Sequence, residues 1–311
     1  DDNMKRIWED KFTEALLKGI AEFKPDIILS HHLFLLTALA CDLNLDIPIY
    51  AFCHGTDIRQ FLSLDKYQDR LINSLMGLKG VFSLNHDQRN VINELYGISL
   101  DNIHVVGGGY DEGLFYPPDN DSIDDKIKIV YAGKLSYAKG LRPLIQCIEE
   151  LKNDHNITLL MAGSGSKDEE YEIRELGKME EVNFLGNLPQ KDLADIFRDS
   201  DIFVLPSYYE GLPLVVMEAL ACNLKIVVSN FKGLIDYIGE PLNSSGLIEY
   251  VKLPKELVLE GLSSEDELRY KDNLKKALEK SIINHILGYN SFAPYKEAIR
   301  NFSWEGVFNK I

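Results

Sequence analysis

Two glutamates flank the start of an apolar helix expected at residues 213–221. Glu210 precedes that helix in the loop PSYYEGLP, and Glu218 lies inside it, about 7.5 Å beyond Pro213 along the helix axis. Pro213 fits the first helical position, and Gly211 lets backbone amides approach a ligand closely. Carboxylates accept hydrogen bonds from sugar hydroxyls, and the free amides of a helix start suit a phosphate. The alternative is a pair of surface acids favoured by the helix dipole, although an apolar helix with one interior acid fits it less well.

A second loop, GKLSYAKG at residues 133–140, joins an expected strand to an expected helix. Its cations Lys134 and Lys139, its two glycines and the free amides of the following helix are the ingredients of a diphosphate site. It is not a Walker A sequence, because no GK followed by Ser or Thr occurs in the chain. Taken alone, the loop fits a solvated connection better than a phosphate site.

Histidines and paired aspartates offer weaker signals. His54 ends an expected strand, where hydrogen bonds to the local backbone explain a histidine equally well. His31 and His32 are adjacent, so we expect their side chains to diverge on a strand, and the seven histidines show no metal-ligand spacing. The segment Asp199-Ser200-Asp201 spells DxD, but at a helix-to-strand junction it is interpreted as solvated acids. No metal site is predicted.

The elements that would position these residues form two blocks in which short apolar strands alternate with helices. Such alternation predicts parallel sheets covered on both faces. Ligands of open α/β sheets bind beyond the carboxyl ends of the strands, which is where both loops lie. Strands are expected at 27–29, 47–52, 81–84, 103–106, 127–132, 157–162, 182–185, 202–205 and 226–228. Helices are expected at 12–23, 33–43, 89–96, 141–151, 169–178, 191–198, 213–221, 263–285 and 303–308.

The turn-rich, acidic segment PPDNDS at residues 117–122 predicts the linker between the blocks. We therefore expect one Rossmann-like domain at 1–120, a second at 121–290, and a C-terminal helical segment at 291–311 that crosses back to the first domain. The first block opens in a helix and offers about four strands, where a Rossmann-type domain has about six. We expect the first domain to be partial, with its first strands and their loops missing.

Composition excludes several classes of protein. The 311 residues are 45% hydrophobic and 26% charged, as in a soluble globular protein, and no apolar run reaches the length of a membrane span. A net charge of −16 argues against nucleic acid as a partner. The four cysteines show no CxxC spacing, and no signal-peptide pattern occurs, so we expect reduced thiols and a cytoplasmic protein.

The segment PSYYEGLPLVVMEALAC resembles the EX7E signature of glycosyltransferase family 4, the group 1 transferases, which have the GT-B fold. Further segments match in the family's order over nearly the whole chain. The EX7E segment is highly specific, the KL…KG loop moderately so, and the GSG pattern is weak on its own. The further matches are HGTD at 54–57, GGYDEGLFYP at 108–117, AGKLSYAKG at 132–140, AGSGS at 162–166, VNFLGNLPQKDLADIF at 182–197 and FSWEGV at 302–307.

The resemblance implies a GT-B protein with two facing Rossmann-like domains, the second of which binds the donor. It implies that Glu218 holds the ribose hydroxyls of a nucleotide-diphosphate sugar. Glu210 would contact the donor sugar and phosphate, together with the backbone of the next three residues, Gly211, Leu212 and Pro213.

The resemblance also implies roles for cations and for the first domain. Lys134 and Lys139 would neutralise the diphosphate and assist its departure, and His54 would lie beside the donor sugar. The implied catalytic residues are therefore His54, Glu210 and Lys139. The implied reaction moves a sugar to the hydroxyl of a saccharide, lipid or small-molecule acceptor with retention of configuration, and needs no metal or other cofactor.

Three features depart from the family. Lys134 replaces the usual arginine and cannot make a bidentate fork to phosphate. The common Asn-Gly-Val-Asp turn is replaced by Gly108-Gly109-Tyr110-Asp111, and the family's N-terminal glycine-rich loop has no counterpart. We therefore expect this chain alone to bind nucleotide but to transfer sugar negligibly. Two other functions stay open: a GT-B nucleotide-sugar 2-epimerase, which would need further acid and base residues around the sugar, and a non-catalytic nucleotide-sugar-binding subunit.

Overall fold

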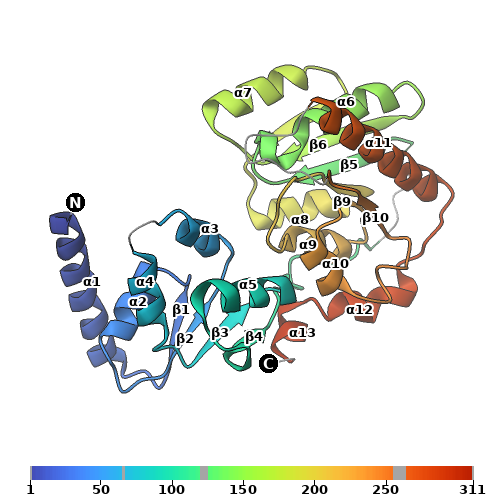
Figure 1. Ribbon diagram of the computed structural model, residues 1–311. Coiled ribbons are helices and arrows are strands. Elements are labelled where there is room, and N and C mark those ends of the chain that lie inside the picture. Colours follow the sequence, from blue (N-terminus) through green and yellow to red (C-terminus); the bar gives the residue numbers. More distant parts are fainter. Residues whose placement is uncertain (1, 65–66, 120–124, 255–263, 310–311) are drawn as a thin grey trace. The chain divides into compact units, whose positions relative to one another are not determined.

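The computed structural model describes residues 2–64, 67–119, 125–254 and 264–309 (Figure 1). The chain divides into two compact units, Asp1–Gly107 and Gly108–Ile311. This division lies ahead of the predicted linker at 117–122, of which residues 120–122 fall outside the described residues. Residues 291–311 belong to the second unit, and their return to the first domain stays a prediction.

The first unit is built on a four-stranded parallel sheet with the order β1-β2-β3-β4. Its core packs strand residues such as Ala51 and Val81, neighbours in the register of β2 and β3, against helix residues such as Ile92. β1 forms one edge, where Leu29 is 53% exposed. The elements are α1 (Asp2–Phe23), β1 (Ile28–His31), α2 (Leu35–Asp42), β2 (Ile49–Phe52), α3 (Thr56–Leu62), α4 (Gln68–Leu75), β3 (Gly80–Ser83), α5 (His86–Tyr96) and β4 (Ile103–Val105).

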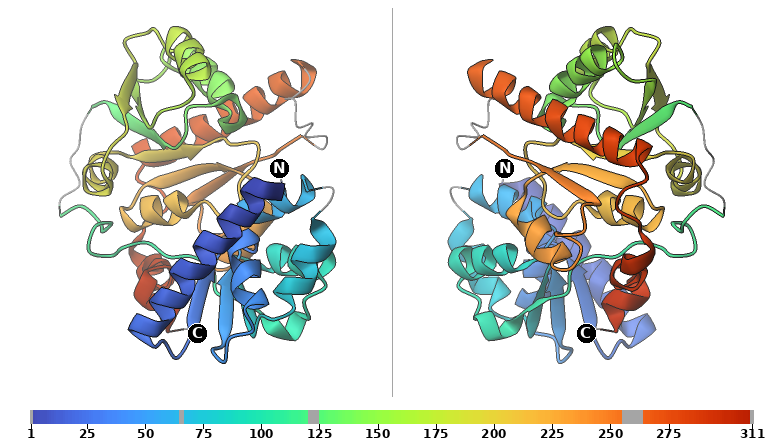
Figure 2. Two further views of the ribbon diagram at one scale, coloured as in Figure 1. Left: turned by 90° about the vertical axis from the view of Figure 1, so that its left-hand side faces the viewer. Right: turned by 90° about the vertical axis from the view of Figure 1, so that its right-hand side faces the viewer.

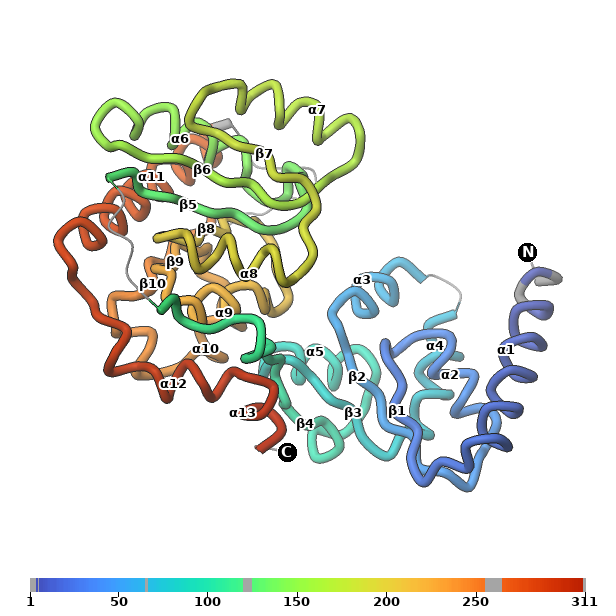
Figure 3. Tube along the Cα trace, turned by 180° about the vertical axis from the view of Figure 1, so that it is seen from behind, coloured from blue at the N-terminus to red at the C-terminus, as the bar shows by residue number. Residues whose placement is uncertain are grey.

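The second unit contains a six-stranded parallel sheet with the order β10-β9-β8-β5-β6-β7, which can be followed in Figure 3. The order runs outward from β5 in both directions, so the sheet has a topological switch point between β5 and β8. Its elements are β5 (Ile127–Ala132), α6 (Leu141–Leu151), β6 (Ile157–Ala162), α7 (Lys167–Leu176), β7 (Val182–Gly186), α8 (Gln190–Arg198), β8 (Ile202–Leu205), α9 (Leu214–Ala221), β9 (Lys225–Ser229), α10 (Lys232–Ile238), β10 (Ile248–Val251), α11 (Ser264–Ile286), α12 (Lys296–Arg300) and α13 (Trp304–Phe308).

Four strands of this sheet, β5, β6, β8 and β9, are largely buried because each is a nearly continuous apolar run covered by helices. The long helix α11 packs against α6, β9 and β10 (Figure 2), through the fully buried Tyr270, Leu274, Leu278 and Ile282, one turn apart. This face of α11 also contacts the loop that follows β8, because the Tyr270 hydroxyl donates to the Pro206 carbonyl oxygen in that loop.

Several short elements escape the sequence patterns. β10 is an edge strand whose Ile-Glu-Tyr-Val sequence lacks a continuous apolar run. α4 is only eight residues long, although its buried Leu71 and Leu75 are one turn apart and could have revealed it.

The prediction that Pro213 is the first residue of α9 is wrong. Pro213 has φ −76° and ψ 91°, and because this ψ is not helical, the residue caps the helix from outside.

The four cysteines are free and buried, which agrees with their interpretation as small hydrophobes. Burial raises the pKa of Cys147 and of Cys222 to about 12. Within the described parts of the chain, no helix combines the length and apolar character needed to cross a membrane.

Candidate functional site

The loops that follow β5, β6, β7 and β8 meet at the carboxyl edge of the second sheet, because parallel strands all end there (Figure 3). β5 and β8 are neighbours at the switch point, so the loops 133–140 and 206–213 lie side by side. The Tyr208 N–H donates to the Ala138 carbonyl oxygen at 2.9 Å, which ties the two loops together. The structure therefore joins the two segments that the sequence singled out separately.

Glycines permit this close packing of loops. Gly140 has φ +65°, and a Cβ there would lie 2.0 Å from the Pro206 carbonyl oxygen. The GSG pattern serves the same purpose, because a Cβ on Gly163 or Gly165 would come within 1.9 Å of a carbonyl oxygen in the loop that follows β5. Only residues without a side chain allow such approaches, so these glycines are required by the contacts between loops.

Lys139 and Glu210, both predicted as catalytic, form an ion pair. The Lys139 Nζ lies 2.6 Å from Glu210 Oε1, although the residues are 71 positions apart in sequence. The Ser207 hydroxyl donates to the same oxygen at 2.7 Å. The two side chains are only 22% and 17% exposed, so the pair is shielded from bulk water and stronger than a surface pair. The ion pair thus holds one cation and one carboxylate in fixed positions beside the switch point.

The residues after Glu210 lead into α9. Gly211 is exposed, and a Cβ built there would meet no atom of the described protein within 4 Å. Its lack of a side chain is therefore not demanded by internal packing. Leu212 is buried, and Pro213 precedes the first turn of α9. Glu218 lies one turn further along this helix, where burial raises its pKa to about 7.

Lys134 lies beside a cavity of about 350 Å³ at the same edge of the sheet. The fully buried Tyr131 donates from its hydroxyl to the Lys134 carbonyl oxygen at 2.8 Å and so fixes the backbone of this lysine. The Lys134 side chain is exposed, in contrast to the paired Lys139. The cavity is lined by Ala132, Gly133, Lys134, Ala162, Gly163, Ser164, Asn187, Leu188 and Leu193.

His54 belongs to the first unit, where it follows β2 in a cluster of imidazoles. His31 Nδ1 lies 2.9 Å from His54 Nε2, and the rings of His32 and His54 have centroids 4.7 Å apart. The prediction that His31 and His32 diverge is wrong, because His32 has φ +73° and leaves the strand geometry. Burial lowers the pKa of His54, and the neighbouring His32 and His31 lower it further, whereas Asp57 acts in the opposite direction.

Asp57 is the residue of this cluster whose role the sequence reasoning missed. Its carboxylate is fully buried and accepts hydrogen bonds from the backbone N–H groups of His54, at 3.0 Å, and of Leu33, at 2.8 Å. It thereby joins the segments that follow β1 and β2 and fixes the backbone of His54. The sequence did carry a signal for this role, namely a carboxylate three positions after a histidine at the end of a strand.

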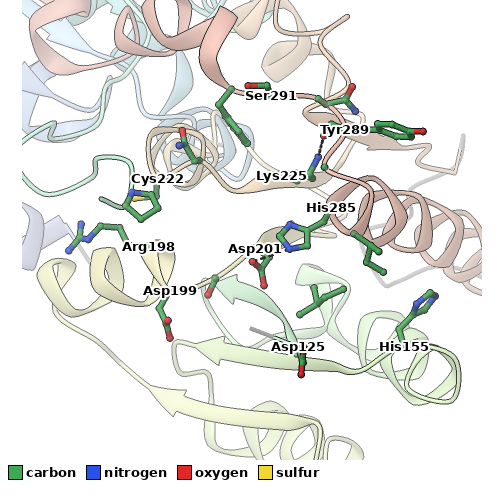
Figure 4. Close-up of a pocket in the computed structure, with 18 of the residues that line it drawn as sticks. Asp125, His155, Arg198, Asp199, Asp201, Cys222, Lys225, His285, Tyr289 and Ser291 are labelled. Atoms are coloured by element: carbon green, nitrogen blue, oxygen red, sulfur yellow. Dashed lines mark hydrogen bonds and ion pairs between the residues drawn. The ribbon is translucent and has the colours of Figure 1, made fainter. Parts of the chain in front are cut away.

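A larger cavity of about 970 Å³ lies at the opposite, amino edge of the second sheet (Figure 4). Asp201 and His285 point toward each other there at 3.3 Å, and the Lys225 ammonium donates to the Tyr289 carbonyl oxygen. Asp199, the other acid of the DxD pattern, pairs with Lys128 at 3.1 Å. Both aspartates are thus engaged by basic side chains. No group of three or more side chains suited to a metal ion occurs among the described residues.

Comparison with known families identifies the chain. The model of a family described as "Glycosyl transferases group 1" matches residues 115–290, more than half of the chain. A second model, "Glycosyltransferase Family 4", matches residues 3–114. The chain belongs to the group 1 glycosyltransferases. The predicted family is therefore confirmed, and the match to the group 1 model includes both loops of the candidate site.

Relatives of this group 1 protein share moderate identity with it. An uncharacterised glycosyltransferase of Methanocaldococcus jannaschii is 35% identical over 133 residues, which are 42% of this chain and 34% of the relative. Glycogen synthase of Mycobacterium tuberculosis is 27% identical over 228 residues, 68% of this chain and 54% of the enzyme. The chain thus spans about a third to a half of these curated relatives.

Solved structures confirm the fold class. Sucrose-phosphate synthase from Thermosynechococcus elongatus superposes with a TM-score of 0.72 at 18% identity, covering 97% of this chain and 75% of that one. Anabaena HepE, solved in complex with UDP and glucose, gives 0.70 at 16% identity and covers 96% of this chain and 79% of that one. The prediction of two Rossmann-like, parallel-sheet units of the GT-B type is confirmed.

Proposed function

We propose that this protein transfers a sugar from a nucleotide-diphosphate sugar to an acceptor hydroxyl, with retention of configuration and without a metal ion. The observation that carries the proposal is the Lys139–Glu210 pair, held at the switch point of a parallel sheet beside the start of α9. A switch point is where open α/β sheets bind nucleotides. Family membership supports the reaction class, as do the names of relatives such as glycogen synthase.

In the proposed site, cations and backbone amides hold the diphosphate. Lys139 and Lys134 face the phosphates, and the amides at the start of α9, close to Gly211, add the positive end of a helix. The absence of a side chain at Gly211 leaves room for the ligand. Negative charge grows on the diphosphate as its bond to the sugar breaks, so these groups stabilise the transition state more than the ground state.

Carboxylates orient the rest of the donor. Glu218 accepts hydrogen bonds from the ribose hydroxyls. Glu210 contacts the sugar and is itself held in place by Lys139 and the Ser207 hydroxyl. His54 has a lowered pKa and is therefore neutral at neutral pH, and the family resemblance supports a role for it beside the donor sugar. In the overall reaction the bond from the anomeric carbon to the diphosphate oxygen breaks. A bond from the acceptor oxygen to the same carbon replaces it, and the proton of the acceptor hydroxyl passes to the released diphosphate or to water.

Replacing Lys139 with Ala tests the proposal. We expect the affinity for a nucleoside diphosphate such as UDP, GDP or ADP to fall by about 1.5–3 kcal/mol, the range for a charged hydrogen bond. Lys152→Ala is the matched control, because Lys152 forms a comparable pair with Glu181 at 3.2 Å with 30% and 24% exposure, at the amino edge of the sheet. Calorimetric titration in which both variants bind like the parent would exclude Lys139 from the site.

Incubation with a panel of nucleotide sugars then separates the candidate activities. A new glycoside in the presence of a saccharide or lipid acceptor supports transfer. An epimerised donor without a glycoside supports a nucleotide-sugar 2-epimerase instead. Donor binding without a glycoside or an epimerised donor supports a binding subunit, provided that a protein extended at its amino end gives the same result.

A further inference from the structure

Two buried hydroxyls lie beneath the loop that carries Glu210. Tyr270, in the middle of the face of α11 that packs on the sheet, donates from its hydroxyl to the Pro206 carbonyl oxygen at 2.9 Å. Ser229, the last residue of β9, donates to the Ser207 carbonyl oxygen at 2.7 Å. Both side chains are fully buried, and their hydroxyl oxygens lie 2.7 Å apart. Two elements outside the loop thus anchor two consecutive carbonyl groups at its start.

The two hydroxyls act as one network. Each carries a single proton, so two protons serve three contacts: one to each carbonyl and one between the hydroxyls. A change in the orientation of either hydroxyl therefore alters the hydrogen bonds of the other, and the two side chains are energetically coupled. The Tyr208 ring also packs edge-on against the Tyr270 ring, with centroids 5.3 Å apart.

The anchored carbonyls stand at the junction of both candidate loops. Pro206 O is the oxygen that faces Gly140, and Ser207 is the residue whose hydroxyl holds Glu210 Oε1. The next residue, Tyr208, donates its N–H to the loop that carries Lys139. A displacement of Pro206 and Ser207 would therefore move Glu210 relative to Lys139. Because a charged contact of 2.6 Å weakens steeply with distance, a small displacement matters.

We propose that Tyr270 and Ser229 are positioning residues: their linked hydroxyls fix the Pro206–Ser207 carbonyls, and so the place of Glu210, for binding of the donor's sugar. The inference rests on the proposed function in one respect, that Glu210 contacts the donor sugar. The positioning itself does not depend on the ligand. A purely structural role would instead satisfy buried carbonyls and affect stability alone.

The test compares Tyr270→Phe and Ser229→Ala with two matched controls. Tyr250→Phe removes the hydroxyl of a half-buried tyrosine that donates to Asn243 instead of the loop. Ser281→Ala removes a buried serine hydroxyl of α11 that has no hydrogen-bond partner among the described residues. Each of the four variants removes one hydroxyl group and keeps the rest of the side chain. Folding is checked by circular dichroism and thermal unfolding before each measurement.

Two readouts are expected to change in the anchoring variants only. Amide hydrogen exchange of residues 207–211 in the free protein should accelerate about tenfold, while that of β9 residues 226–228 stays as in the parent. Affinity for UDP-glucose, used as the sugar-bearing probe, should fall about three- to tenfold, with affinity for UDP changed less than about twofold. The double variant should lose less than the product of the single losses, because the hydroxyls share one network.

The outcomes separate this inference from the proposed function. Unchanged exchange at 207–211 in both anchoring variants overturns the positioning role, whatever the ligand data show. Equal losses of UDP and UDP-glucose affinity overturn its link to the sugar. If the parent binds neither probe nor the other nucleoside diphosphates, the proposed function fails, and faster exchange at 207–211 still supports the anchoring of the loop. If one anchoring variant fails to fold, the other decides.

Discussion

At the scale of single residues, Glu218 couples the candidate site to stability. Its pKa rises from 4.5 to about 7 because burial disfavours the charged form. The folded chain therefore keeps this proton to a higher pH than the unfolded chain does. Stability from this group is fully present below pH 4.5 and is lost as pH rises to about 7. A buried acid retained at such a cost fits a role in binding rather than in folding.

Glu218→Gln should remove this pH dependence. We expect the variant to match the parent near pH 4 and to exceed its free energy of unfolding by about 1–3 kcal/mol at pH 8. Binding of nucleoside diphosphates should weaken in the same variant. Urea denaturation across this pH range measures the difference, with Glu172→Gln, an exposed acid of α7, as the control. Parallel stability curves for Glu218→Gln and the parent would contradict the buried, protonated state of Glu218.

At the scale of elements, the candidate site depends on two loops packed backbone to backbone. Gly140 is the closest point, since it combines φ +65° with the approach to the Pro206 carbonyl oxygen. It also stands at the start of α6, directly after Lys139 in its 3₁₀ turn, Tyr137–Lys139. An added side chain would therefore separate the loops at the position where the ion pair forms.

Gly140→Ala should cost both stability and ligand affinity. The left-handed backbone alone costs alanine about 1–2 kcal/mol, and the displaced loop adds to this. Gly288→Ala isolates the backbone cost, because Gly288 has the same φ of +65° and nothing within 4 Å of an added Cβ. Denaturation and UDP titration compare the two variants. We expect Gly140→Ala to be the less stable and to bind UDP at least tenfold more weakly, and equal behaviour of the two would argue against coupling between the loops.

At the scale of the whole molecule, the elements proposed to bind the donor all belong to one compact unit. Every predicted donor-binding residue lies in Gly108–Ile311, whereas His54 lies in Asp1–Gly107, which has a core of its own. Each unit contains a separate parallel sheet, so neither needs strands of the other to complete its own hydrogen bonds. The second unit thus holds all the groups proposed to bind the diphosphate.

A fragment spanning residues 108–311 should therefore fold and bind nucleoside diphosphate by itself. We expect its affinity for UDP, or for whichever diphosphate the full chain prefers, to lie within about threefold of that of the full chain, because the phosphate and ribose contacts are retained. Calorimetry on both proteins provides the measurement. A fragment that folds but fails to bind would place an essential binding group in residues 1–107.

The sequence by itself determined the local elements and the kinds of chemistry available. The strands at 127–132, 157–162 and 202–205 coincide with the observed ones, because a short apolar run between helical stretches favours a buried parallel strand. The two loops could also be identified from the sequence. Their cations, glycines and glutamates restrict the local backbone and the ligands that it can hold.

Only the tertiary structure decided which of these groups meet. Strands that are equally apolar carry no local mark of their neighbours, so the position of β8 beside β5 could not be read from periodicity. That pairing brings Lys139 to Glu210 across 71 residues, and the packing of α11 brings Tyr270 to Pro206 across 64. The ring of His32, a residue with positive φ, likewise meets the ring of His54 across 22 positions of sequence. Sheet order and side-chain packing are cooperative properties of the whole chain, and the site exists only where they place its parts together.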